Sequence, residues 1–181
     1  MLSVHHRLSH FFFSGMGLNA SMEKGADVSF EIIPPIQMPA QLGQSVDNGG
    51  FMVAEPLGTK AIAAGTADLQ FLSGELWPDH PCCVVVLREE LIREHQDLAH
   101  EFVSSMVQSG KVLQKRPDIG ASVAVDFLDP QKKLGLKVPI LKNVLTEDQG
   151  IRTDDLFPEI VELEVMQRYM REKMEVGTPI D

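Results

Sequence analysis

The sequence predicts an α/β fold, with a mostly parallel sheet in residues 1–87 and a helical C-terminal region in residues 88–181. Three observations support this prediction. Short apolar segments alternate with short helical segments through residue 87, as in βαβ units. Residues 82–87 contain three consecutive valines, which favour a buried strand. From residue 89 onward, apolar residues recur at three- and four-residue steps, which indicates helices. We therefore expect a ligand-binding lobe followed by helices that complete or cover it.

Local patterns predict the elements of the first region. Residues 7–16 form an expected helix, because Leu8, Phe11 and Phe12 share one face. Residues 28–33 alternate apolar and polar side chains, which predicts a strand that ends at two prolines. The other expected elements are a short helix at 37–42, a buried strand at 51–54, a helix at 57–64 and strands at 69–72 and 82–87.

The second region is predicted to be helical, with one interruption. Residues 89–115 have a continuous helical pattern, and Pro117 starts another helix that runs to residue 127. Residues 132–145 are less regular and are interpreted as a loop or linker. A last amphipathic helix is expected over residues 156–174, where Pro158 is acceptable in the first turn.

Composition and charge exclude some classes of function. The chain has 181 residues and a net charge of −10, without the clustered Lys and Arg that nucleic-acid binding requires. No apolar run is long enough to cross a bilayer. Residues 1–6 contain neither the cationic nor the apolar part of a signal peptide, so nothing exports the chain as written.

The two cysteines are adjacent, at Cys82 and Cys83. Neighbouring residues on a strand point to opposite faces, so a disulfide between them would be strained. A metal site is not expected from this pair alone, because tetrahedral sites need about four ligands. We therefore expect buried structural thiols. The chain also lacks the common hydrolase, metalloprotease, P-loop and dinucleotide-binding motifs, which argues against an enzyme.

Polar side chains stand at the ends of two predicted strands. Glu55 follows the strand at 51–54, whereas Trp77 and His80 lie in the loop before the strand at 82–87. Open α/β sheets bind ligands at strand ends, so these side chains are candidate contacts. The alternatives are a strand-terminating turn for Glu55 and simple core packing for Trp77.

A second candidate lies at the start of the first helix, where His5, His6 and His10 cluster. Their spacing lacks the carboxylate or cysteine partner of a metal site, so no metal is expected. A helix N-terminus favours an anion, which Ser3 and His5 could meet. A capping turn with solvated histidines explains the pattern equally well.

Several segments together resemble the nitrate/sulfonate/taurine-type substrate-binding proteins of bacterial ABC importers. The resemblance rests on SVHHRLSHFFFSGMGLN, VSFEIIPPIQMPAQL, VDNGGFMVAEPLGTKAIAAG and LWPDHPCCVVVLREEL, and it weakens after about residue 132. It implies a periplasmic-binding-protein-like (type II) fold, in which two lobes close on a small anion or a sulfonate-like compound. By the same resemblance, the chain begins in the second lobe and lacks the first half of the first lobe.

The resemblance also implies partners and a location. We expect an ABC permease as partner, a periplasmic or extracytoplasmic location, and a homodimer formed through the exposed lobe face. The position after the tryptophan, often cationic in nitrate binders, is Pro78 here, which puts nitrate itself in doubt. The candidate ligand-binding residues are Ser3, His5, Gln37, Glu55, Trp77 and His80.

The predicted function is noncovalent capture of a small anionic nutrient by the solute-binding component of an importer, or by its C-terminal portion. No cofactor or metal is expected. Two alternatives remain open at this point. One is a ligand-sensing regulatory module fused to or associated with a transporter. The other is a degenerate, truncated homologue without binding activity.

Overall fold

A computed structural model describes residues 4–42, 44, 49–173 and 175 of the chain. Its described part is rich in helices and contains one small parallel sheet. The elements in chain order are α1 (Val4–Gly15), β1 (Ala20–Ser21), β2 (Val28–Ser29), η1 (Pro35–Gln37), α2 (Met38–Gln41), α3 (Leu57–Ala63), α4 (Ser73–Leu76), α5 (Glu89–Glu94), α6 (Gln96–Lys115), α7 (Pro117–Leu128), α8 (Val138–Thr146) and α9 (Ile160–Lys173).

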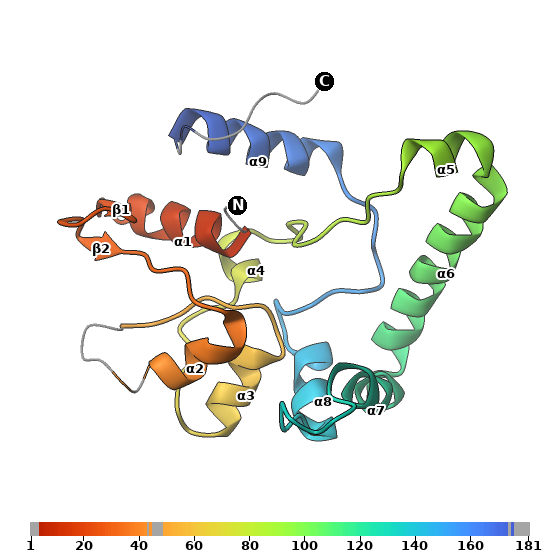
Figure 1. Ribbon diagram of the computed structural model, residues 1–181, viewed down its shortest axis with the longest axis horizontal. Coiled ribbons are helices and arrows are strands. Elements are labelled where there is room, and N and C mark those ends of the chain that lie inside the picture. Colours follow the sequence, from red (N-terminus) through yellow and green to blue (C-terminus); the bar gives the residue numbers. More distant parts are fainter. Residues whose placement is uncertain (1–3, 43, 45–48, 174, 176–181) are drawn as a thin grey trace.

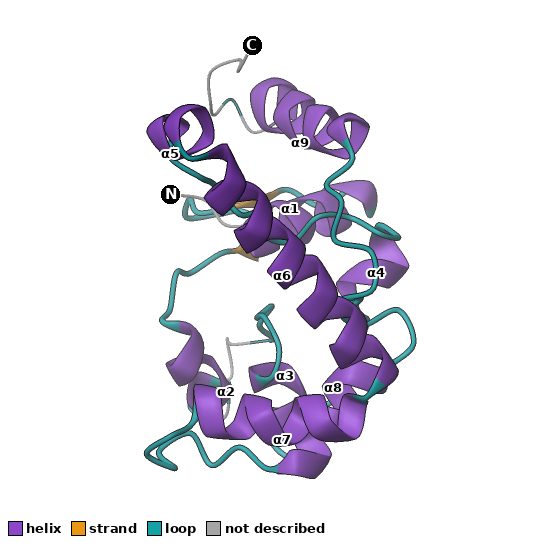
Figure 2. Cartoon of the chain, turned by 90° about the vertical axis from the view of Figure 1, so that its right-hand side faces the viewer, coloured by secondary structure: helices purple, strands orange, loops and turns teal. Residues whose placement is uncertain are grey.

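The helices form two groups joined by α6. One group contains α1, the small sheet, α4 and α9, which lies over α1, while the other contains α2, α3, α7 and α8 (Figure 1). The long helix α6 runs from α5, beside the first group, to α7 in the second (Figure 2). The first and the last described helices, α1 and α9, therefore lie together in the first group, which also contains the candidate ligand residue His5 (Figure 1).

The predicted sheet is much smaller in the structure. Ala20 pairs with Val28 and Ser21 with Ser29 in parallel register, and these are the strands of the described residues. The segments at 51–54, 69–72 and 82–87 are not strands, so this part of the prediction was wrong. Strand propensity stabilises a strand mainly through packing against neighbouring strands. Here Val86 is 84% exposed, because no described strand lies beside it.

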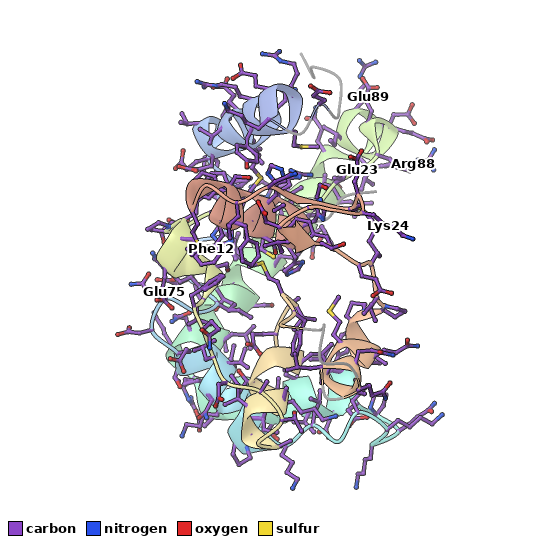
Figure 3. All side chains as sticks on the ribbon, turned by 90° about the vertical axis from the view of Figure 1, so that its left-hand side faces the viewer. Phe12, Glu23, Lys24, Glu75, Arg88 and Glu89 are labelled. Carbon is purple, nitrogen blue, oxygen red and sulfur yellow. The ribbon has the colours of Figure 1, made fainter. Side chains whose placement is uncertain are left out.

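Helices α1, α2 and α3 lie where the sequence predicted helices, although α1 begins three residues earlier, at Val4, whereas α4 was not predicted. On α1, Leu8 is buried and Phe12 packs against Phe71 with ring centroids 4.5 Å apart. Figure 3 shows Phe12 beside α4, whereas Glu75, Arg88 and Glu89 lie toward the outside. The apolar face inferred for this helix is thus the face that packs.

Three helical details of the second region differ from the prediction, and one of them is that the last helix begins at Ile160, beyond Pro158, and not at residue 156. The helix expected over 89–115 is interrupted at His95, whose backbone angles of φ −135° and ψ 56° separate α5 from α6. The segment expected to be a loop at 132–145 contains helix α8, which begins at Val138 with Pro139 in its first turn. Proline is tolerated there because the first N–H groups of a helix have no intrahelical partner.

The best-packed part of the molecule lies between α7 and α8. Ala121, Leu136 and Leu141 form a buried cluster, with exposed fractions of 0%, 7% and 4%. Asp129, also buried, accepts hydrogen bonds from the backbone N–H groups of Leu134 (2.9 Å) and Leu136 (3.0 Å). This carboxylate therefore shapes the connection that brings α8 back against α7.

The segment at 147–157, which leads to α9, packs closely against α4 and α6. A Cβ atom at Gly74 would stand 2.3 Å from the carbonyl oxygen of Gln149, and one at Gly110 would stand 2.2 Å from that of Thr153. The Thr153 hydroxyl also donates to the Gly110 carbonyl at 2.8 Å. Glycine is required at both positions, because the segment at 147–157 lies directly on the backbones of α4 and α6.

Candidate functional site

The first turns of α1 direct His5 and Ser9 to one side of the helix, since residues four apart are neighbours on a helix surface. The Ser9 hydroxyl donates to the His5 carbonyl at 2.9 Å, and it lies 3.5 Å from the sulfur of Met52. Met52 belongs to the segment at 51–54. This side of α1 therefore faces the segment that the sequence analysis placed at the ligand.

Trp77 and His80 form one compact unit at the end of α4. Trp77 ends the helix, and Asp79 turns the chain with a positive φ of 56°. The rings of Trp77 and His80 are stacked, with centroids 5.9 Å apart and planes 27° apart. His80 Nδ1 lies 2.6 Å from the Trp77 carbonyl oxygen. Because a carbonyl can only accept, the proton of a neutral His80 ring is on Nδ1 and leaves Nε2 available as an acceptor.

The structure brings His5 close to the Trp77–His80 unit. Burial lowers the pKa of His5, and the charge that His80 can carry lowers it further. A lowered pKa favours the neutral imidazole at neutral pH. Neutral imidazole can donate one hydrogen bond and accept one, so this pair suits a small polar ligand.

Helix α9 covers the outer side of this region. The indole N–H of Trp77 donates to a carboxylate oxygen of Glu162 at 2.6 Å. Further along, His10 Nδ1 lies 2.8 Å from the Tyr169 hydroxyl, and the rings of Phe11 and Tyr169 meet edge to face at 5.6 Å. The two contacts of Tyr169 hold α9 alongside α1. The contact of Glu162 places a carboxylate on the only polar atom of the Trp77 indole.

Arg7 is a residue that the sequence reasoning missed. Its Nε atom is buried and has no hydrogen-bond partner among the residues that the structure describes. Burial lowers the pKa of its guanidinium, although arginine keeps its charge in proteins. The signal in the sequence was a single cation among the histidines and phenylalanines of an otherwise amphipathic helix. Nothing in the pattern showed that its carboxylate partner would be missing.

The other predicted ligand residues are not part of this cluster. Glu55 caps α3, because its carboxylate accepts the backbone N–H of Thr59 at 3.1 Å, and a Cβ atom at Gly58 would lie 2.9 Å from it. Gln37 is exposed in η1, beside α2. Ser3 lies outside the described residues. The structure thus joins His5, Trp77 and His80 and gives Glu55 a structural role.

The expectation of buried thiols was wrong. Cys82 and Cys83 are both free and exposed, and their sulfur atoms lie 4.0 Å apart. The prediction assumed a central strand, whose two faces would each bury one thiol. Without a neighbouring strand, neither face of the segment at 82–87 is covered.

The described residues contain no group of three or more His, Cys, Asp or Glu side chains arranged to hold a metal ion. Within the same part of the chain, none of the helices combines the length and the apolar character that a membrane span needs. The candidate site consists of the imidazoles of His5 and His80 and the indole of Trp77.

Comparison with known proteins identifies the family. Residues 2–125 match the model of the NMT1-like family, and because this match covers more than half of the chain, the chain belongs to that family. It is also 26% identical over 107 residues to the nitrate/nitrite binding protein NrtA of Nostoc sp. strain PCC 7120.

That alignment covers 59% of this chain and 23% of the cyanobacterial protein, so the chain spans less than a quarter of this relative's length. No solved structure matches the chain. The two matches confirm the resemblance to nitrate-type substrate-binding proteins that the sequence predicted. The family match over residues 2–125 includes α1, α4 and their connecting segments.

Proposed function

We propose that this chain is the solute-binding component, or a portion of it, of an ABC importer for a small anion or sulfonate-like nutrient. Capture is noncovalent and the chain is not an enzyme. The observation that carries the proposal is the convergence of His5 with the stacked Trp77–His80 pair. Family membership and the similarity to a nitrate/nitrite binding protein support the ligand class.

The arrangement suits a small anion for two reasons. The imidazole of His5 can donate a hydrogen bond to an anion, and the flat aromatic faces of Trp77 and His80 exclude water from one side of a ligand. A nearby anion favours the protonated form of His5, which would then bind it with a full positive charge. The site would therefore strengthen its own electrostatic attraction when it is occupied.

The proposal extends to the wider assembly. Residues 1–87 would contribute one wall of a type II periplasmic-binding-protein cleft, and residues 88–181 would complete or cover it. The partner would be an ABC permease, and the chain would be located in the periplasm or elsewhere outside the cytoplasm. Large exposed apolar side chains, among them Phe127 at 80% and Val86 at 84%, support a further contact such as a homodimer.

Fluorescence tests the proposal directly, because Trp77 is the sole tryptophan. Titration with nitrate, bicarbonate, taurine and methanesulfonate is expected to change its emission saturably for at least one of them. His5→Ala should weaken that response at least tenfold, while His100→Ala, at an exposed position of α6, should leave it unchanged. A flat emission with all four compounds at millimolar concentration would contradict the proposed ligand class.

A further inference from the structure

Arg7 differs from the arginines whose ion pairs the structure shows. Arg88, Arg93, Arg152 and Arg171 each have a carboxylate oxygen within 4 Å, the tightest of these contacts being 2.5 Å. Arg7 has no carboxylate partner in the described part of the chain, although the protein contains 26 acidic residues and 16 basic ones. Its side chain is half-buried, and the enclosed Nε atom lacks a hydrogen bond.

Enclosing the Nε–H group of an arginine without an acceptor is costly. Removing charge from water carries a penalty that a carboxylate partner normally offsets, and a buried donor without an acceptor adds to it. An acidic protein could supply such a partner easily. Among the residues that the structure describes, this cation thus has no carboxylate counterion, and it lies on the helix that also carries the candidate ligand residue His5.

Helix geometry places Arg7 beneath α9. Residues three and four positions along α1, His10 and Phe11, both contact Tyr169 of α9, so Arg7 occupies the same side of α1 one turn earlier. Glu162, one acidic residue of α9 that reaches this region, is hydrogen-bonded to Trp77 instead. The enclosed Nε atom of Arg7 therefore lies on the α9 side of α1 without an acceptor among the described residues.

We propose that Arg7 is the charged residue of an oxyanion-binding site between α1 and α9. Its ligand is a small planar oxyanion, the class that includes nitrate, bicarbonate and carboxylates, because a guanidinium fork holds two oxygens of such a group in parallel hydrogen bonds. The Tyr169 hydroxyl, on the covering helix, is a neutral donor within the same contact. The site faces α9, whereas His5 faces Met52 and His80, so it is distinct from the site of the proposed function.

Nuclear magnetic resonance can observe this residue by itself. The enclosed Nε–H of Arg7 should exchange slowly with water and give a separate arginine side-chain signal, assigned by its loss in Arg7→Lys. Titration of the whole chain with sodium nitrate and sodium formate is expected to shift this signal saturably, while equal sodium chloride leaves it in place. A signal unmoved by both planar anions, or moved equally by chloride, would overturn the proposal.

Calorimetry with matched variants provides the second test. Arg7→Met and Arg7→Lys should each weaken nitrate or formate binding at this site at least tenfold, the lysine variant because it keeps the charge but loses the fork. Arg168→Met removes the same charge from an exposed position of α9 and should bind like the wild type. Equal losses in the Arg7 and Arg168 variants would indicate general charge screening and contradict a site.

Separate controls distinguish an effect on the Arg7 site from an effect on folding and from an effect on the site at His5, Trp77 and His80. The thermal midpoint of Arg7→Met should not fall, because an unpaired charge is replaced by an apolar chain. If that variant fails to fold, Arg7→Lys and the wild-type titration decide. A response of the Arg7 signal without a response of Trp77 fluorescence would refute the proposed function and support the Arg7 site. A response of Trp77 fluorescence without a response of the Arg7 signal would support the proposed function and refute the Arg7 site.

Discussion

The α7–α8 unit and the contact between α1 and α9 differ in how fully their buried polar groups are hydrogen-bonded. Between α7 and α8, Ala121 is fully buried and the buried carboxylate of Asp129 is satisfied by backbone N–H groups. Between α1 and α9, polar and aromatic side chains meet, and the buried Nε of Arg7 has no partner. The first arrangement gives stability, while the second leaves donors available. We infer that the α7–α8 unit supports the fold, and that ligands bind around α1, at His5 beside the Trp77–His80 unit and at Arg7 beside α9.

The largest expected effect is on the α7–α8 core. Leu141→Ala removes a side chain that is 4% exposed and should lower the free energy of unfolding by about 2–5 kcal/mol, because the cavity it leaves cannot fully close. Leu98→Ala, at a position that is 52% exposed on α6, should cost less than about 0.5 kcal/mol. Urea unfolding followed by circular dichroism measures both. Equal losses would show that the core is elsewhere.

Asp129 should rank next. Although burial works in the opposite direction, hydrogen bonds from the backbone N–H groups of Leu134 and Leu136 hold the pKa of Asp129 below its usual value. Its stabilisation is therefore present above the unfolded-state pKa of about 3.9 and is lost as the pH falls through the folded value. Asp129→Ala should lower the thermal midpoint at pH 7, whereas the exposed Asp126→Ala should not. Thermal scans between pH 7 and pH 3 test this, and parallel curves for wild type and Asp129→Ala would refute it.

A smaller effect is expected where α9 meets α4. Trp77→Phe removes the indole N–H that donates to Glu162, and should cost about 1 kcal/mol of stability, the net value of one hydrogen bond. Glu162→Gln keeps an acceptor at this position and should cost less. The fluorescence emission of Trp77 in Glu162→Gln should nevertheless change, because the negative charge beside the indole is lost. Unchanged fluorescence in Glu162→Gln would show that α9 does not cover Trp77 in solution.

The smallest expected effect concerns pH and His5. Because burial and His80 lower the pKa of His5, the folded state binds fewer protons than the unfolded state as the pH falls toward and below 6.5. Stability should therefore decrease over this range, and His5→Gln should flatten the decrease. His100→Gln, on the exposed surface of α6, is the matched control. A steeper decrease in His5→Gln than in the wild type would contradict the assignment.

The sequence predicted the helices better than the sheet. Helices are stabilised by bonds between residues four positions apart, so the patterns around Leu8 and Pro117 were sufficient to locate α1 and α7. A strand depends on a neighbour that local pattern does not specify, and the valines at 84–86 are exposed for that reason. Helix α8 was missed because Pro139 and Lys142 obscured the apolar face that buries Leu141 and Val144.

The candidate site was predictable in part. Unusual residue types at segment ends drew attention to Trp77 and His80, and the structure places His5 near them. The capping role of Glu55 depends on the turn that precedes α3, which a pattern of apolar residues does not reveal. The position of Arg7 depends on where α9, more than 150 residues later, returns to α1. Such contacts between distant segments could not be derived from local spacing.

Hydrogen–deuterium exchange tests the central claim most directly, because it observes both regions in one experiment. Exchange would be measured with and without nitrate, bicarbonate, taurine and methanesulfonate, each at millimolar concentration. We predict that at least one of them slows exchange in α1 and in residues 73–80, and leaves residues 117–146 unchanged. Protection confined to residues 117–146, or no protection with any of the four compounds, would contradict the assignment of ligand binding to α1 and the Trp77–His80 unit.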